Sequence, residues 1–126
     1  MRCGIVRWSW IVLVLLAAHD VTHLADGGLD TSPGQLALVA IPQWIVLALV
    51  MGIIVRDPAH RRAAATVLGA SVAVGFALVH LVPFSPTAYW DLEPSALSWA
   101  LVWVPATAGL VLVALARPAR STLQPS

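Results

Sequence analysis

Three histidines lie within or beside long apolar segments, and they are the residues whose spacing best suits site chemistry. His19 and His23 are four residues apart, so in a helix with 3.6 residues per turn they share one face. Imidazoles at this spacing can bind one metal ion, and His80 from another segment could supply a third ligand. The pattern indicates a possible transition-metal site near one end of a helical bundle.

Nearby polar residues could support such a site. Asp20 or Asp26 could accept a hydrogen bond from a metal-bound imidazole and hold the ring in place. Gln43 is expected at the same depth in a neighbouring segment. Haem is a less favoured version of this hypothesis, because bis-histidine ligation needs opposed ligands from two helices and only His80 lies on a second helix.

A simpler interpretation makes the histidines structural. Each ring would hydrogen-bond to a carbonyl or to Thr22, Gln43 or Asp20 and so set the register between helices, at about 0.6 kcal/mol per bond in a membrane. We favour this interpretation over metal binding. Proton or ion transport is disfavoured, because the half of the apolar segments away from the histidines holds no ionisable residue beyond Arg7 at the start of the first segment.

Tryptophans suggest another alternative, a pocket for an apolar ligand. Trp99 and Trp103 are four residues apart on one helical face, and Trp44 and Trp103 are expected to be deep enough to pack in the core. Trp99 better fits the aromatic belt at a membrane surface.

Catalysis finds little support in the sequence. A Ser-His-Asp set requires the combination of Ser98, His80 and Asp20, and the chain has no phosphate-binding glycine loop and no Cys-x-x-Cys pair. We therefore do not expect an enzyme. A net charge of +1 gives no indication of nucleic-acid binding.

The elements that must position these residues are apolar helices. Of the 126 residues, 60% are hydrophobic and only 10% are charged, whereas soluble domains carry about 25% charged residues. Segments of roughly 20 apolar residues can cross a bilayer, and backbone in lipid must satisfy its own hydrogen bonds as helix. The sequence predicts an all-α, integral membrane four-helix bundle in a single domain, with helices at 5–24, 35–55, 63–84 and 96–116 and a disordered tail at 121–126.

Charge placement predicts the orientation of these helices. The seven positive charges are all arginines, and all flank the apolar segments on one side: Arg2, Arg7, Arg56, Arg61, Arg62, Arg117 and Arg120. Short loops rich in arginine stay in the cytoplasm. We therefore expect a multi-pass protein of the cell membrane, with both termini cytoplasmic and outer loops at 25–34 and 85–95. His60 falls in the arginine-rich loop and is expected to be solvated.

The first segment has a rival interpretation as a cleaved signal peptide. Arg2 and Arg7 would form its basic region, and residues 8–16 its apolar core. The residues before the possible cut, Leu16-Ala17-Ala18, lack the usual small residue three positions back, so we favour a permanent helix. The mass of the mature protein distinguishes the two.

The third segment carries small residues at helical spacing. Gly69, Ala73 and Ala77 recur every four residues, which lets helices approach closely in lipid. We expect this face to meet protein and to carry His80 at its end, beside the first segment. Pro42 and Pro105 interrupt the second and fourth helices and each leave a carbonyl without its usual partner.

The combined expectation is a small membrane protein that acts as a non-catalytic subunit or interaction protein of a membrane assembly, in contact with lipid and with other subunits or further copies of itself. The alternative is a membrane metal-binding protein that uses His19, His23 and His80.

Overall fold

Every element in the described part of the chain is helical. The computed structural model describes residues 2–25, 33–81 and 96–118, and no strand occurs within these ranges. Helix α1 spans Arg2–Ala25, α2 spans Pro33–Arg56, α3 spans Arg61–Phe76 and α4 spans Ala96–Ala116. A five-residue π-helical segment, η1 at Ala77–Leu81, continues α3. The predicted all-α bundle of four helices is confirmed, with helix ends that differ from prediction by a few residues.

Three helices are long and apolar enough to cross a membrane. These are the stretches Cys3–Thr22, Arg61–Leu81 and Trp99–Ala116, and a shorter apolar stretch, Ala40–Arg56, belongs to α2. The predicted tail at 121–126 and most of the predicted outer loops lie outside the described residues.

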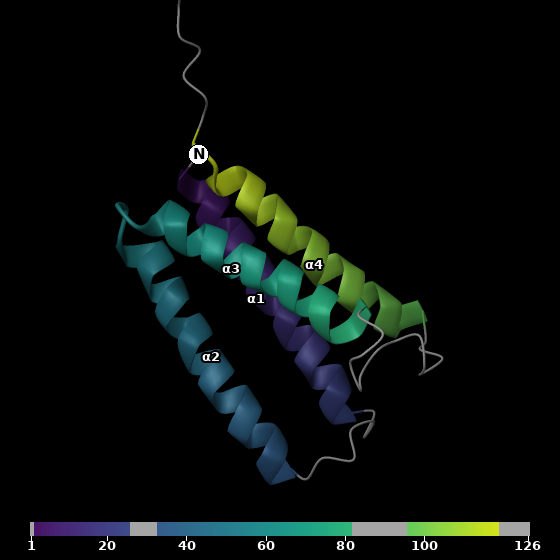
Figure 1. Cartoon of the computed structure of the whole chain (residues 1–126). Helices are drawn as coiled ribbons and strands as arrows, with labels where there is room; N and C mark the ends of the chain where they lie inside the picture. The colour runs from purple at the N-terminus through teal and green to yellow at the C-terminus, as the bar shows by residue number, and fades with distance from the viewer. Residues whose placement is uncertain (1, 26–32, 82–95, 119–126) are drawn as a thin grey trace, which may run out of the picture.

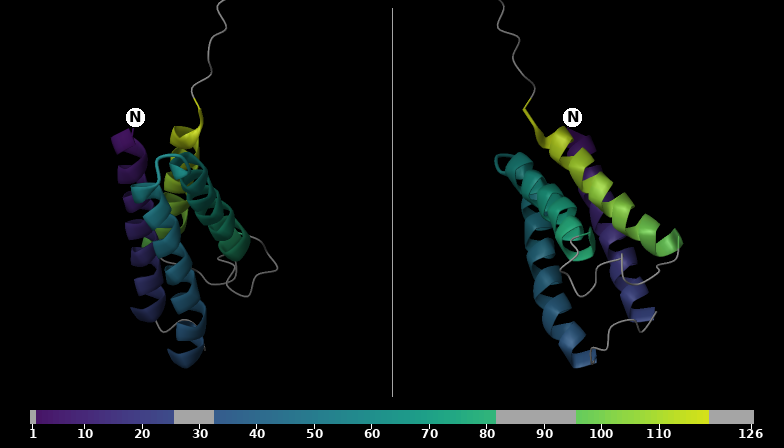
Figure 2. Two further views of the ribbon diagram at one scale, coloured as in Figure 1. Left: turned by 90° about the vertical axis from the view of Figure 1, so that its left-hand side faces the viewer. Right: turned by 45° about the vertical axis from the view of Figure 1, so that its right-hand side comes forward.

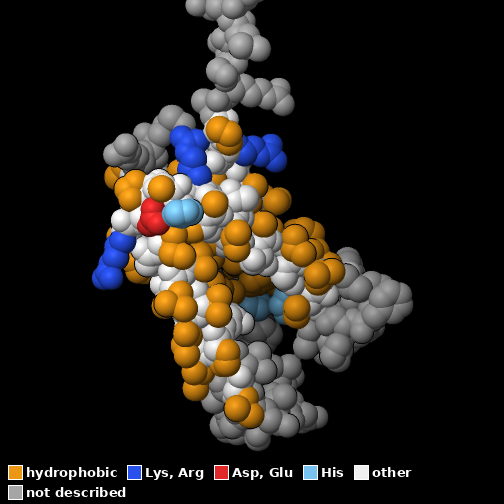
Figure 3. All heavy atoms as spheres, turned by 60° about the vertical axis from the view of Figure 1, so that its left-hand side comes forward, with side chains coloured by type: hydrophobic (Ala, Val, Ile, Leu, Met, Phe, Trp, Pro, Cys, Tyr) orange, Lys and Arg blue, Asp and Glu red, His pale blue; other side chains and the backbone are white. Residues whose placement is uncertain are grey.

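The helices alternate in direction, so the arginines gather at one end. The N-terminus, the connection between α2 and α3 and the end of α4 lie together (Figures 1 and 2). Arginine side chains cluster there on the molecular surface (Figure 3). Arg61 joins the end of α2 to α3, since its side chain donates to the carbonyls of Ile54 and Val55. Arg62 donates to the carbonyl of Arg117 at 3.1 Å and so ties α3 to the end of α4.

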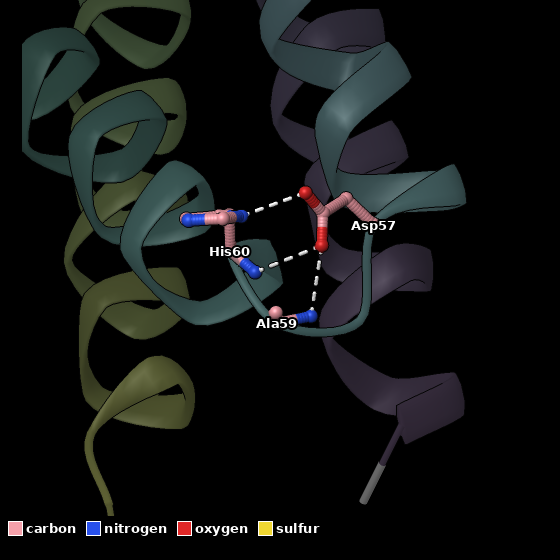
Figure 4. A network of polar contacts seen from close by, with 3 residues as sticks. All are labelled: Asp57, Ala59 and His60. Atoms are coloured by element: carbon pink, nitrogen blue, oxygen red, sulfur yellow. Dashed lines mark hydrogen bonds and ion pairs between the residues drawn. The ribbon is translucent and has the colours of Figure 1, made fainter.

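A tight turn connects α2 to α3 (Figure 4). Asp57 Oδ1 accepts hydrogen bonds from the backbone N–H groups of Ala59 and His60, and Asp57 Oδ2 lies 2.7 Å from His60 Nδ1. The imidazole bond, and then the backbone bond from His60, lower the pKa of Asp57 below its usual value of 3.8. The exposure expected for His60 is confirmed.

The tightest helix crossing joins α3 to α4 at two glycines. A Cβ atom added to Gly69 would lie 2.5 Å from the carbonyl oxygen of Gly109, and one added to Gly109 would lie 2.6 Å from the carbonyl oxygen of Gly69. Such proximity is what small residues permit between helices in lipid. The small-residue face of α3 therefore meets protein, as predicted, and its neighbour is α4.

Helix α2 lies at the edge of the bundle and is only half enclosed (Figures 1 and 2). Among the side chains of α2 that the structure describes, the buried ones are Leu47, Met51 and Ile54, all in the half nearer the arginines. Between residues 38 and 46, no side chain that the structure describes is buried. The outer half of α2 is therefore less enclosed than its inner half.

Candidate functional site

A cavity of about 690 Å³ lies beside the less enclosed half of α2. Helix α1 contributes one wall, α2 a second, and α3 with η1 the third. Its lining residues are Leu16, His19, Asp20, Pro42, Gln43, Val46, Leu47, Ser71, Val72, Gly75, Phe76, Val79 and His80. Figure 3 shows histidine side chains within a hollow of the surface. Most of the lining is apolar, with a few polar groups, which is the usual composition of a small-molecule site.

Two of the three histidines singled out by the sequence meet in this cavity. His19 and His80 are both 4% exposed, and their ring centroids lie 5.0 Å apart in an edge-to-face arrangement. Their Nδ1 atoms are both buried. The expectation that His80 approaches His19 across two adjacent helices is confirmed.

Phe76 completes this pair as a cluster of three rings. Its ring centroid lies 4.6 Å from that of His19 and 5.6 Å from that of His80. The sequence analysis missed Phe76, although its position four residues before His80 was a usable signal, since residues four apart in a helix are neighbours.

His80 lies in the π-helical segment that continues α3. Because a π-helix closes its hydrogen bonds over five residues instead of four, it holds more residues per turn than the preceding α-helix. Gly69 and Ala73 face α4, whereas His80 contacts His19 on α1. Phe76, which lies in α3 at nearly the same angle around the helix as Gly69, also contacts the His19 ring, so the end of α3 borders α1 as well as α4.

A hydrogen bond between α1 and α2 involves Asp20, the acidic residue that lines the cavity. Trp44 Nε1 donates to Asp20 Oδ2 at 3.0 Å. This bond links α1 to α2. Thr22, expected as an interhelical partner, instead donates its hydroxyl to the carbonyl of His19 within α1.

The structure does not bring every predicted site residue together. The side chain of His23 and all of Asp26 lie outside the described residues. Gln43 is exposed on the cavity wall. No group of three His, Cys, Asp or Glu residues is placed to hold a metal ion within the part of the chain that the structure describes, so His19 and His80 have no described third ligand.

The expected tryptophan pocket is not the cavity that forms. Trp44, Trp99 and Trp103 are all absent from its lining. Trp103 is 48% exposed, so the expectation that it packs in the core is wrong. The Ser-His-Asp combination is not assembled by the described residues, because the side chain of Ser98 lies outside them.

Comparisons with known proteins give no relative: no family model, no curated protein and no solved structure matches this chain.

Proposed function

We propose that this protein is a four-span integral membrane protein of the cell membrane, with both termini cytoplasmic, that serves as a non-catalytic subunit or interaction protein of a membrane assembly. The single observation that supports the interaction role is the outer half of α2. It lacks buried side chains among those described, yet it carries large apolar ones.

One face of α2 is suited to a partner helix. Leu38, Ile41, Ile45 and Leu49 recur at helical spacing and are between 56% and 77% exposed. By the 3.6-residue period this face lies more than 100° around the helix from the centre of the cavity wall on α2. A partner, either another membrane protein or a second copy, would meet this face without entering the cavity.

The arginine end supports the proposed orientation. Of the arginines where α1 begins, α2 meets α3 and α4 ends, five have side chains that the structure describes: Arg7, Arg56, Arg61, Arg62 and Arg117. Retention of positively charged short loops in the cytoplasm then places both termini inside. With α2 included, four helices cross the bilayer.

Thiol labelling tests this orientation. Cys3 is exposed and is expected to react with an impermeant maleimide only from the cytoplasmic side. In a Cys3→Ser background, Asp30→Cys and Asp91→Cys are expected to react from the outside. Labelling of either introduced thiol only from the cytoplasm would contradict the topology.

Photo-crosslinking tests the interaction role. A photoreactive amino acid at Leu49 is expected to give one discrete protein adduct in native membranes. Leu110 on α4, which is 61% exposed, is the matched control and is expected to give lipid adducts only. Lipid adducts alone from both positions would contradict the proposal.

Metal binding is the second candidate function, favoured by the 5.0 Å separation of the His19 and His80 rings. His23 would supply the third ligand. Stoichiometric metal in the purified protein that disappears in a His19→Ala, His23→Ala double variant would support this role. Metal-free protein that forms the Leu49 adduct would support the subunit role instead.

A further inference from the structure

The cavity is open along one side, between α2 and α3. Its lining there includes Pro42 and Val46 on α2, Ser71 on α3 and Val79 on η1, and all four are exposed. If the bundle crosses the membrane as proposed above, this opening faces hydrocarbon and not water. An apolar molecule dissolved in the bilayer can then enter sideways, and water has little access to compete for the space.

Among the described residues that line the cavity, the buried polar side chains are His19 on α1 and His80 on η1. His19 lies about 18 Å along α1 from Arg7, at 1.5 Å per residue, which is within the thickness of a hydrocarbon core of about 30 Å. A neutral imidazole carries one N–H donor and one acceptor nitrogen. The rings of His19, His80 and Phe76 also present faces and edges with which a planar group can stack.

The charge of the cavity selects among amphipathic ligands. The carboxylate of Asp20 lines the cavity and is held by Trp44. A fatty acid or phosphate headgroup placed beside the histidines would bring a second acidic group near Asp20, and two such groups cannot both be ionised without strong repulsion in an apolar medium. A neutral headgroup with carbonyl oxygens meets no such repulsion and can accept hydrogen bonds from the imidazoles.

We propose that this cavity binds a neutral amphiphile of the quinone class, with its planar carbonyl-bearing head against His19, His80 and Phe76 and its hydrocarbon tail passing between α2 and α3 into the bilayer. The proposal rests on the membrane placement proposed above. It is independent of whether a partner covers the outward face of α2.

Gly75 provides a direct test, because it lines the cavity and a Cβ atom added there meets nothing within 4 Å. Gly75→Leu is expected to fill the cavity while leaving the bundle intact. Gly52→Leu is the matched control: Gly52 on α2 also has open space around its Cβ position and does not line the cavity. Val46→Phe fills the same cavity from α2 and replaces Gly75→Leu if that variant does not fold.

The probe is a decyl-tailed benzoquinone, titrated into the purified full chain in lipid nanodiscs and followed by saturable quenching of tryptophan fluorescence. We expect the wild type and Gly52→Leu to bind equally. Gly75→Leu or Val46→Phe should weaken binding at least about tenfold, equivalent to about 1.4 kcal/mol. Equal binding by the cavity-filling variant and the wild type would overturn the proposal.

The headgroup is tested separately with decyl-benzene, which has the tail and ring without carbonyls. His19→Ala, His80→Ala is expected to lose binding of the quinone, and decyl-benzene is expected to compete poorly with it. If decyl-benzene competes as well as the quinone, the cavity takes tails alone and the quinone assignment is wrong. Thiol labelling of the same preparation before extraction shows whether a negative result reflects a failed topology or a failed ligand assignment.

Discussion

One hydrogen bond joins two walls of the cavity, so a single substitution at its donor should have a measurable effect. The hydrogen bond from Trp44 to Asp20 joins α1 to α2, and α2 has few other buried contacts in its outer half. Trp44→Phe keeps the apolar ring but leaves the carboxylate without this donor. We expect a loss of about 1–2 kcal/mol in the free energy of unfolding, measured by denaturant titration in detergent. Trp10→Phe, at a position 52% exposed, is the control and should change stability little; equal losses would show that the hydrogen bond is unimportant.

The turn at Asp57 should make stability depend on acid pH. Its pKa is lowered mainly by the hydrogen bond with the His60 side chain, so the folded state prefers the charged carboxylate. The resulting stabilisation is present above the usual pKa of 3.8 and is lost as the pH falls through the lower folded-state pKa.

An Asp57→Asn variant tests this dependence. It should be less stable than the wild type at neutral pH, and the difference should shrink as the pH falls below 3.8. Thermal unfolding in detergent across this range measures the difference. A constant difference between the two proteins would show that the Asp57 carboxylate does not contribute through its ionisation.

At the scale of single residues, the sequence indicated which side chains belong to the candidate site. It was less successful in predicting which residues they contact. The meeting of His19 with His80 followed from helical spacing and depth. The donation from Trp44 to Asp20 did not, because it depends on how α1 and α2 are rotated against each other, and an apolar sequence leaves that rotation undetermined.

Helix positions follow closely from the sequence, because length, apolarity and flanking prolines or arginines determine them. Two features of the elements were not predictable in this way. Gly109 meets Gly69 across a helix pair, and a single glycine does not reveal its partner. The π-helical segment Ala77–Leu81, which carries His80, has no sequence signature as clear as proline.

The glycine crossing allows a matched test at the element scale. Gly69→Ala places a Cβ atom 2.5 Å from a backbone carbonyl oxygen of α4, so the two helices must separate. We expect a loss of about 1–3 kcal/mol from overpacking. Gly75→Ala has open space around its Cβ and gains up to about 1 kcal/mol in helix propensity. Denaturant unfolding of both variants in detergent compares them, and equal stability would contradict close packing at Gly69.

On the scale of the whole molecule, the bundle combines a tightly packed side with an open one. Helices α3 and α4 approach to backbone contact, and arginine side chains join the helix ends at one end of the bundle. In the outer half of α2, by contrast, no described side chain between residues 38 and 46 is buried. A cavity beside a loosely held helix suits a molecule that must enter from the side, because moving α2 disturbs none of the α3–α4 packing.

The outer half of α2 is therefore expected to open before the rest of the bundle. Amides at 43–46 should exchange with deuterium faster than those at 48–54, since local opening is easiest where few apolar contacts are buried. The segments around the two helical prolines, Pro42 and Pro105, provide an internal comparison. Pro42 is exposed on α2, whereas Pro105 is fully buried in α4, so the segment around Pro105 should stay protected although it also lacks one backbone bond. Hydrogen exchange with mass spectrometry in nanodiscs measures both segments.

Pro42→Ala restores the bond to the Leu38 carbonyl and should slow exchange in α2 alone. Uniform protection along α2, or faster exchange around Pro105, would show that the cavity is not bordered by a mobile helix.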